Sequence, residues 1–513
     1  MAPALIPFAF ALLAGWAHAL SIALPWNGQP LWWLQLLALA ALAGLVQRTD
    51  SWRRAACLGW AFATAWLCGT FWWLFISMHV YGGLASPLAA IAVFALGAFV
   101  ALYYAAAMAA CTALRGIPLA WRAVLFGAVW LLAELARARW FTGFPWGAAG
   151  YAHVDGPLAV LAPWIGVYGI GAVAAGLAFG LSLAVRAGML RSWRYWAGLG
   201  TAAGLLAACN MAATIPEDPP DGASLSVALL QGNIPQDEKF QGGTGIPVAL
   251  NWYGEQLRSS PAGLVVAPET AIPLLPQQLP PAYLGALRER FADGDRAALV
   301  GLPLGGLQEG YTNSVIGWQP GHDPYRYDKH HLVPFGEFIP PLFRWFTDLM
   351  HIPLGDFNRG GLRQPTFDWQ GQRLAPNICY EDLFGEEIGA SFAQPARAPT
   401  VLVNVSNIAW FGNSVAIDQH LQISRMRALE FRRPMLRATN TGATAIIDHR
   451  GRVARMLPRH TRGVLTGTVQ GQTAITGYAW WVSRLGLWPL WLLGLGVVAL
   501  AWRTRARAGT AAG

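Results

Sequence analysis

The sequence predicts an α-helical membrane domain joined to a water-facing α/β domain. The 513 residues are 55% hydrophobic and only 12% charged, whereas soluble chains carry about a quarter charged residues. Long apolar runs fill residues 1–214 and return near the C-terminus. Between them, Asp and Glu become frequent and short β-rich runs alternate with helical patterns. These three observations indicate one part in lipid and one part in water.

Eight apolar runs approach the roughly 20 residues that a helix needs to cross a bilayer. The fifth is the weakest candidate, because Glu134, Arg137 and Arg139 interrupt its end. The first run contains Ala17-His18-Ala19, which imitates a signal cleavage site, but no Lys or Arg precedes it. A retained helix is therefore favoured over a secretory signal. The predicted spans are residues 5–24, 31–47, 56–77, 88–112, 123–138, 158–185, 196–214 and 480–501.

Arginine placement predicts the orientation of these spans, because cytoplasmic loops carry an excess of Lys and Arg. Arginines such as Arg48, Arg115 and Arg186 follow the even-numbered spans, whereas the loops LPWNGQP and MHVYGGLASP contain none. Arg137 and Arg139 are exceptions. We expect both termini in the cytoplasm and the segment between the last two spans outside it.

The segment after the Pro- and acid-rich linker IPEDPPDG is expected to fold as an α/β domain. SLSVALLQ, GLVVAPE, AALVGLPL, TVLVNVS and ATAIIDH are typical of strands, and AYLGALRERFA and HLQISRMRALEFR of helices. The predicted parts are membrane helices in 1–214, a linker at 215–223, the outer domain at 224–472, a last membrane helix at 478–502 and a cytoplasmic tail at 503–513.

One segment of this domain, FIPPLFRWFTDLMHIPL, places apolar residues at helical spacing with few charges. It is either a buried core helix or an amphipathic arm in the lipid interface.

Nucleic-acid binding is not expected, despite the net charge of +9. No basic run is interleaved with aromatic residues and no zinc-ligand spacing is present. Four of the five cysteines lie in apolar runs, which leaves Cys379 without an obvious disulfide partner.

Two charged residues come after predicted strands and could carry chemistry. Glu269 closes the apolar run in LVVAPETAIP, where partial desolvation would raise its pKa and suit it to act as a base. By itself, Glu269 is also compatible with a surface position at a strand end. Lys329, beside His330 and His331, could remain charged and stabilise an oxyanion. The paired histidines do not predict a metal, because strand neighbours point to opposite faces and no HExxH spacing accompanies them.

Cys379 stands between RLAPNI, a predicted strand, and EDLFGEEIGASFA, a predicted helix. A cysteine at such a turn lies near a helix N-terminus, which lowers a thiol pKa. Such a position favours thiolate formation without a histidine partner. The polar and aromatic loop VSNIAWFGN, which holds Trp410 and Phe411, could form a lid.

These motifs, in this order, resemble the Glu-Lys-Cys triad of the nitrilase superfamily. LQGNIPQDEKF, APETAIP, KHHLVPFGEFIP, ICYEDLFG, SNIAWFG, HLQISRMRALEFRRPMLRATNTG and FTGFPWG together resemble the apolipoprotein N-acyltransferase family over essentially the whole chain. The resemblance implies eight spans and one extracytoplasmic nitrilase-like domain with an α-β-β-α sandwich.

By this resemblance, Cys379 is the nucleophile, Glu269 the general base and Lys329 the oxyanion stabiliser. Glu337 matches a supporting glutamate. The pair after the nucleophile is matched by Tyr380 and Glu381.

The resemblance also suggests substrate-binding or lid residues, namely Phe240, Trp410, Phe411, Trp345 and Phe346. Phe240 stands where the family has Trp, and Ile408 where an Asp is more usual. Both departures lie in the substrate loops and not in the triad.

The reaction implied is transfer of an acyl chain from a phospholipid to the α-amine of a diacylglyceryl-cysteine that opens a lipoprotein. It would run through a thioester, without cofactor or metal, in a monomer in the bacterial inner membrane, with a periplasmic catalytic domain. Two alternatives are a membrane-tethered amidohydrolase with water as acceptor, and a catalytically inert lipid transporter or receptor. For a transporter, Glu134 with Arg137 or Arg139 is the candidate ionisable pair.

Overall fold

The computed structural model describes residues 2–189, 224–306, 308–339 and 357–510. The chain divides into two compact units. The first contains Met1–Trp72, Pro87–Glu217 and Leu485–Gly513, and the second contains Trp73–Ser86 and Asp218–Arg484. The predicted span 196–214 and the linker 215–223 lie outside the described residues.

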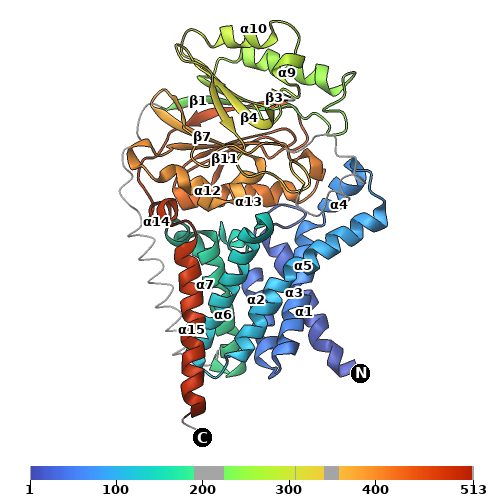
Figure 1. Ribbon diagram of the computed structural model, residues 1–513, viewed down its shortest axis with the longest axis vertical. Coiled ribbons are helices and arrows are strands. Elements are labelled where there is room, and N and C mark those ends of the chain that lie inside the picture. The colour runs from blue at the N-terminus through green and yellow to red at the C-terminus, as the bar shows by residue number, and fades with distance from the viewer. Residues whose placement is uncertain (1, 190–223, 307, 340–356, 511–513) are drawn as a thin grey trace. The chain divides into compact units, whose positions relative to one another are not determined.

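The first unit is built from long helices rich in Ala and Leu (Figure 1). Many of their large apolar side chains face outward, such as Leu5, Ile91 and Leu492, each more than 60% exposed. A surface of this kind suits lipid rather than water. The helices are α1 (Ala2–Ile22), α2 (Trp32–Gln47), α3 (Trp52–Phe71), α5 (Ser86–Ala113), α6 (Leu119–Arg139), α7 (Ala162–Arg186) and α15 (Trp488–Thr510), with 3-10 turns at Trp140–Thr142, Ala149–His153 and Pro157–Leu161.

Three helices in the described part of the chain are long and apolar enough to cross a membrane: Leu5–Ile22, Ser86–Ala113 and Pro157–Arg186. The number rises to five if each of two bent helix pairs forms one span, and α2 is a shorter apolar helix. The helix α6, the weakest predicted span, is not among them, because charged residues lie in both its first and last turns.

Glu134 and Arg137 of α6 are fully buried and fix the loop that follows. Arg137 Nη1 donates to the backbone oxygens of Phe144 and Trp146, at 3.0 and 2.7 Å. Glu134 Oε1 accepts from the backbone N–H of Ala149 at 2.7 Å. These contacts give the pair a structural role.

The second unit contains two six-stranded sheets (Figure 1). The first has the order β12-β1-β2-β3-β4-β5 and the second β11-β10-β9-β8-β7-β6. The strands are β1 (Leu225–Gln231), β2 (Leu264–Val266), β3 (Ala297–Gly306), β4 (Gly310–Trp318), β5 (Tyr325–Asp328), β6 (Phe367–Trp369), β7 (Gln372–Ile378), β8 (Val401–Ser406), β9 (Met435–Thr439), β10 (Ala445–Ile447), β11 (Val453–Met456) and β12 (Gly463–Val469).

The two sheets pack face to face, and helices cover their outer faces (Figure 1). Alternate residues of each strand make the two cores: Leu229 and Val266 meet Val403 between the sheets, whereas Val265 faces Tyr253 on a helix. The result is an α-β-β-α sandwich. The helices are α9 (Gly245–Ser259) and α10 (Tyr283–Arg290) on the first sheet, and α12 (Gly385–Gly389) and α13 (Ala416–Phe431) on the second.

Both sheets have three central parallel strands, β1-β2-β3 in one and β7-β8-β9 in the other. Parallel strands buried on both faces favour continuous apolar runs, such as Leu264–Val266. The loops after these strands carry the polar motifs of the sequence, so parallel pairing brings the motifs to common edges.

The structure differs from the expected domain boundaries in two places. Helix α3 ends at Phe71, and the segment after it, with α4 (Leu74–Ile76) and a π-helical turn (Ser77–Tyr81), belongs to the second unit. The expected continuous helix 478–502 is split into α14 (Gly477–Leu485) and α15. Gly486, at φ 55°, supplies the left-handed residue at the break.

Candidate active site

Cys379 begins a sharp turn at the carboxyl end of β7. The strand ends at Ile378, and Cys379 opens a 3-10 helix that runs to Leu383. Its φ of 53° is unusual for a residue with a side chain. Left-handed backbone of this kind clusters at active sites, where surrounding contacts hold it. The carbonyl oxygen of Cys379 accepts a hydrogen bond from Asn404 Nδ2 at 3.3 Å. His420 Nε2 also lies 3.3 Å from this oxygen.

The pKa of the Cys379 thiol lies above its ordinary value, and the lowering expected from a helix N-terminus is not found. Burial and the negative charge of Glu269 raise the pKa of Cys379 to about 12, although Lys329 and the hydroxyl of Ser406 lower it. A 3-10 helix of five residues has too small a dipole to outweigh burial. Ionisation of this thiol near neutral pH would therefore need a base beside it.

Glu269 lies in the loop after β2, facing three hydrogen-bond donors. Its Oε1 accepts from Asn313 Nδ2 at 2.7 Å and lies 3.3 Å from Lys329 Nζ. Its Oε2 accepts from the backbone N–H of Asn407 at 2.8 Å. Burial raises the pKa of Glu269, but Lys329, Asn313, Lys239 and the N–H of Asn407 outweigh it and leave the pKa below the ordinary value. The sequence-based prediction of a raised pKa for Glu269 is therefore wrong.

Lys329 follows β5 directly and is held by two carboxylates. Its Nζ lies 2.9 Å from Glu337 Oε1 and 3.3 Å from Glu269 Oε1. Asn313 joins the same two acids, because its Nδ2 also donates to Glu337 Oε1 at 2.7 Å. Burial lowers the pKa of Lys329, but Glu337 and Glu269 raise it more, so the pKa lies well above the usual range. The two carboxylates therefore favour the charged form of Lys329.

Glu381 ties the turn at Cys379 to the segment that carries Lys329. Its Oε2 accepts from the N–H of Ile378 at 2.6 Å and the hydroxyl of Tyr327 at 2.9 Å. Its Oε1 accepts from the N–H groups of His330 and His331, at 2.7 and 3.2 Å. The side chain of Glu381 therefore fixes the relative position of two loops.

Tyr380 is a packing residue beside this connection. It is 5% exposed, and its ring centroid lies 5.6 Å from that of His331 and 5.3 Å from that of Phe384.

The two histidines after Lys329 face different partners. His330 Nδ1 lies 2.8 Å from the carbonyl of Gly360, and His331 Nδ1 lies 2.9 Å from Glu387 Oε1. Within the described ranges, no group of three metal-ligating side chains is found.

A cluster of buried polar side chains contacts the Cys379 turn. Asp382 accepts from Ser424 Oγ at 2.6 Å and lies 2.7 Å from His420 Nε2. Arg437 Nη2 lies 2.9 Å from His420 Nδ1, and its Nη1 donates to Asn404 Oδ1 at 3.0 Å. All five side chains are fully buried. This cluster was not predicted from the sequence. The pattern that could have indicated it is the polar pair His420 and Ser424, which lie four residues apart and therefore on the same face of a helix.

The suggested lid residues lie in two loops of the second unit. The ring of Phe411 lies 4.2 Å from that of Trp73, whose Nε1 donates to Gln419 at 3.0 Å. Trp410 is 38% exposed and contacts Tyr81 edge to face. Residues 73–86 thus brace the 408–411 loop. Phe240 is 43% exposed, and its ring lies 6.0 Å from Lys239 Nζ.

The suggested residues Trp345 and Phe346, with most of the FIPPLFRWFTDLMHIPL segment, lie outside the described residues. Ile408, one of the two departures from the family pattern, is fully buried.

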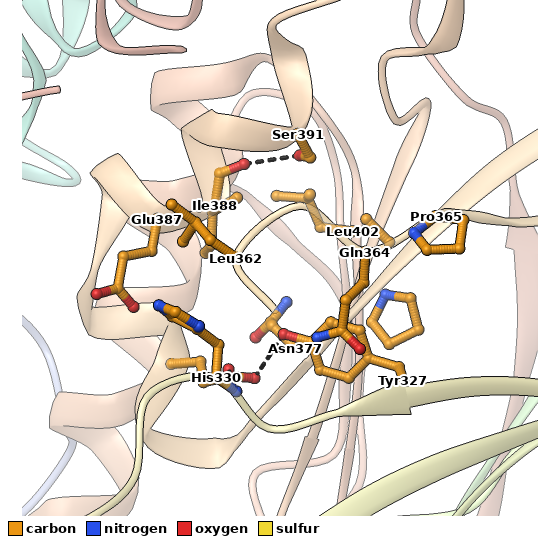
Figure 2. Close-up of a pocket in the computed structure, with 13 residues that line it drawn as sticks. Tyr327, His330, Leu362, Gln364, Pro365, Asn377, Glu387, Ile388, Ser391 and Leu402 are labelled. Atoms are coloured by element: carbon orange, nitrogen blue, oxygen red, sulfur yellow. Dashed lines mark hydrogen bonds between the residues drawn. The ribbon is translucent and has the colours of Figure 1, made fainter. Parts of the chain in front are cut away.

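A small cavity is lined in part by Glu381, with Tyr327, His330 and Asn377 also in its wall (Figure 2). Its volume of about 50 Å³ has room for a few water molecules. Cys379, Glu269 and Lys329 do not line it, so this cavity is not the place where an acyl chain would meet the thiol.

The α-β-β-α sandwich, with a buried glutamate and lysine acting electrostatically on the Cys379 turn, is typical of the carbon–nitrogen hydrolase class. Residues 205–477 match the family model described as "Carbon-nitrogen hydrolase". Residues 5–180 match the model "Apolipoprotein N-acyltransferase N-terminal domain".

Curated relatives cover nearly the whole chain. The apolipoprotein N-acyltransferase of Verminephrobacter eiseniae is 62% identical over 93% of each chain. That of Ralstonia nicotianae is 49% identical over 94% of this chain and 91% of its own, and that of Nitrosomonas europaea 41% identical over 87% and 88%. The chain belongs to the apolipoprotein N-acyltransferase family.

Proposed function

We propose that this chain transfers an acyl chain from a membrane phospholipid to the α-amine of the N-terminal S-diacylglyceryl-cysteine of apolipoproteins. The observation that carries the proposal is the Glu269–Lys329–Glu337 cluster, which acts electrostatically on Cys379 in its positive-φ turn, in a chain of this family. The reaction runs in two steps through a thioester on Cys379.

In the first step, Cys379 attacks the ester carbonyl of the phospholipid as Glu269 takes the thiol proton. A bond forms between sulfur and the acyl carbon, and Lys329 stabilises the oxyanion. The ester C–O bond then breaks, and the proton on Glu269 passes to the leaving oxygen of the lysophospholipid. Because the pKa of Cys379 is about 12 and that of Glu269 is lowered, proton transfer and attack must be concerted.

In the second step, the free α-amine attacks the thioester. The C–S bond breaks, an amide forms, and a proton returns through Glu269 to the Cys379 sulfur. Glu337 holds Lys329 charged, and Glu381 and Tyr380 position the nucleophile turn. Phe240, Trp410 and Phe411 supply apolar surface for the acyl chains, and we assign Trp345 and Phe346 to the same surface.

We further propose that the enzyme works in the bacterial inner membrane as a monomer. The proposed topology has seven spans within residues 1–214, an eighth at 478–502, both termini in the cytoplasm and the catalytic domain at 224–472 in the periplasm. The outward-facing leucines of the first unit and the arginine bias of its loops support this arrangement. Both substrates are lipids, so lateral arrival from the bilayer suits them.

Mass spectrometry of the full-length protein with phospholipid alone tests the proposal. We expect a fatty-acyl mass on the peptide that contains Cys379, absent from Cys379→Ala, and discharged by a diacylglyceryl-cysteine peptide to give an amide. Free fatty acid as the main product would instead favour the amidohydrolase. Lack of any adduct would favour an inert lipid-binding domain.

A further inference from the structure

Lys239 is a second lysine at Glu269. It lies in the loop after β1 and is only 2% exposed. Its Nζ donates to the backbone oxygen of Glu269 at 3.2 Å. Across the described ranges its ammonium has no ion-pair partner, whereas Lys329 has two.

Lysine is rare in this sequence. The chain has 36 Lys and Arg residues, and Lys239 and Lys329 are the two lysines among them. Both make contacts to Glu269. Arginine cannot lose its proton in a protein, whereas a buried lysine can. The chain therefore places both of its lysines at one residue, Lys329 at the carboxylate of Glu269 and Lys239 at its backbone oxygen.

The two lysines have opposite electrostatic environments. Glu337 and Glu269 keep Lys329 charged, so it cannot accept a proton. Burial lowers the pKa of Lys239 to about 7, and the negative charge of Glu269 only partly offsets this. Cys379 would also raise this pKa, but only when its thiol is ionised, and the Phe240 ring beside Lys239 carries no charge. Near neutral pH, a substantial fraction of Lys239 is thus the free amine.

The second step of the reaction involves one more proton than Glu269 returns to the sulfur. An α-amine has a pKa near 8 and enters mostly as an ammonium ion. It loses one proton before attack, to free its lone pair, and a second as the amide forms. The departing sulfur takes up one of these two protons. The other must go to a different acceptor.

We propose that Lys239, as the free amine, accepts the proton that the incoming α-ammonium loses before attacking the thioester. An N–H bond of the ammonium breaks, its electron pair becomes the nucleophile, and the lone pair of Lys239 Nζ forms the new N–H bond. Lys239 then releases this proton to solvent, and Glu269 remains available to return the other proton to Cys379. The inference rests on the proposed function and names the acceptor of the first proton that the α-ammonium loses.

Separate measurement of the two steps tests this role, with full-length Lys239→Met and Lys239→Arg proteins. In Lys239→Arg, which keeps a cation beside Glu269, thioester formation from phospholipid should slow much less than the discharge step; Lys239→Met also removes a charge that lowers the pKa of Glu269. Discharge by a diacylglyceryl-cysteine peptide at pH 7 should slow at least tenfold, since general base catalysis contributes about 10²–10⁴. The loss should shrink above pH 8, where the peptide amine is already neutral.

Hydroxylamine, which is uncharged at neutral pH, provides the control nucleophile. It should discharge the thioester of wild type and both variants at similar rates, because it has no proton to lose before attack. Equal slowing with hydroxylamine would show a structural role, and equal slowing of thioester formation would place Lys239 in the first step; either result overturns the assignment. A wild-type protein that forms no thioester would instead refute the proposed function.

Discussion

Lys329 Nζ lies closer to Glu337 than to Glu269, at 2.9 Å against 3.3 Å. The supporting carboxylate thus makes the shorter ion pair with the lysine. Glu337 partly neutralises the positive charge of Lys329. Without Glu337, this charge would lower the pKa of Glu269 further and make Glu269 a weaker base. Asn313, which donates to both acids at 2.7 Å, holds this arrangement.

Glu337→Gln should slow thioester formation about 10- to 100-fold, which corresponds to the loss of one charged hydrogen bond. Glu269 would then face Lys329 alone and become a weaker base. The measurement is the initial rate of acyl-adduct formation by mass spectrometry, with Glu309→Gln, an exposed acid, as the matched control. An unchanged rate would remove Glu337 from the site.

Alkylation of Cys379 should be slow at pH 7 and should rise with pH without a plateau below about pH 11. The reason is its pKa of about 12, so the thiolate fraction grows tenfold per pH unit. Iodoacetamide labelling of a variant that retains Cys379 as its one cysteine measures this. A plateau below pH 9 would contradict the protonated resting thiol.

Glu269→Gln should make the same alkylation faster, by about tenfold per unit of pKa, while abolishing acyl transfer. The carboxylate of Glu269 raises the pKa of Cys379, so its removal favours the thiolate. Acceleration with loss of activity would separate the electrostatic effect of Glu269 from its role as a base. Slower labelling in this variant would mean that Glu269 activates the resting thiol.

Stability should depend on pH through Lys239. Its pKa is about 7 in the folded protein against 10.5 ordinarily, so the unfolded chain binds more protons between these values. Stability therefore rises with pH across that window and is lowest below pH 7. Lys239→Met should raise the apparent Tm at pH 6.5 and less at pH 9.5. Equal shifts at both pH values would argue against a buried, unpaired lysine.

The sequence located the parts of this site, but not their chemistry. Glu269, Lys329 and Cys379 stood out because each follows a β-rich run, and β1, β2, β3, β8 and β10 all occur where such runs were expected. The lowered pKa of Glu269 was not predictable, because Asn313 and Asn407 lie 44 and 138 residues away in the chain.

Strand pairing and helix breaks were the harder features of the fold. β12 pairs with β1 across the length of the domain, and no local pattern specifies such a partner. A single residue, Gly486, divides the last helical region. Trp73 was assigned to a span by its apolar surroundings, yet its indole bonds to Gln419 of the second unit. Long-range contacts of this kind override local hydropathy.

Glu381→Gln should uncouple the nucleophile turn from the Lys329 loop. Glu381 accepts four hydrogen bonds through two oxygens, and a glutamine can present just one acceptor oxygen to them. At least one buried N–H or the Tyr327 hydroxyl would lose its partner, at a cost of about 1–3 kcal/mol each. Thermal unfolding in detergent measures the loss, with the exposed Glu289→Gln as control.

The same variant should also form the thioester at least tenfold more slowly, because Cys379 and Lys329 are no longer held in one geometry. Glu381→Asp keeps the charge but shortens the side chain, so it should restore stability only in part and leave the acylation rate low. If Glu381→Asp recovered full activity, the charge of Glu381 would be what matters, and its reach between the two loops would not.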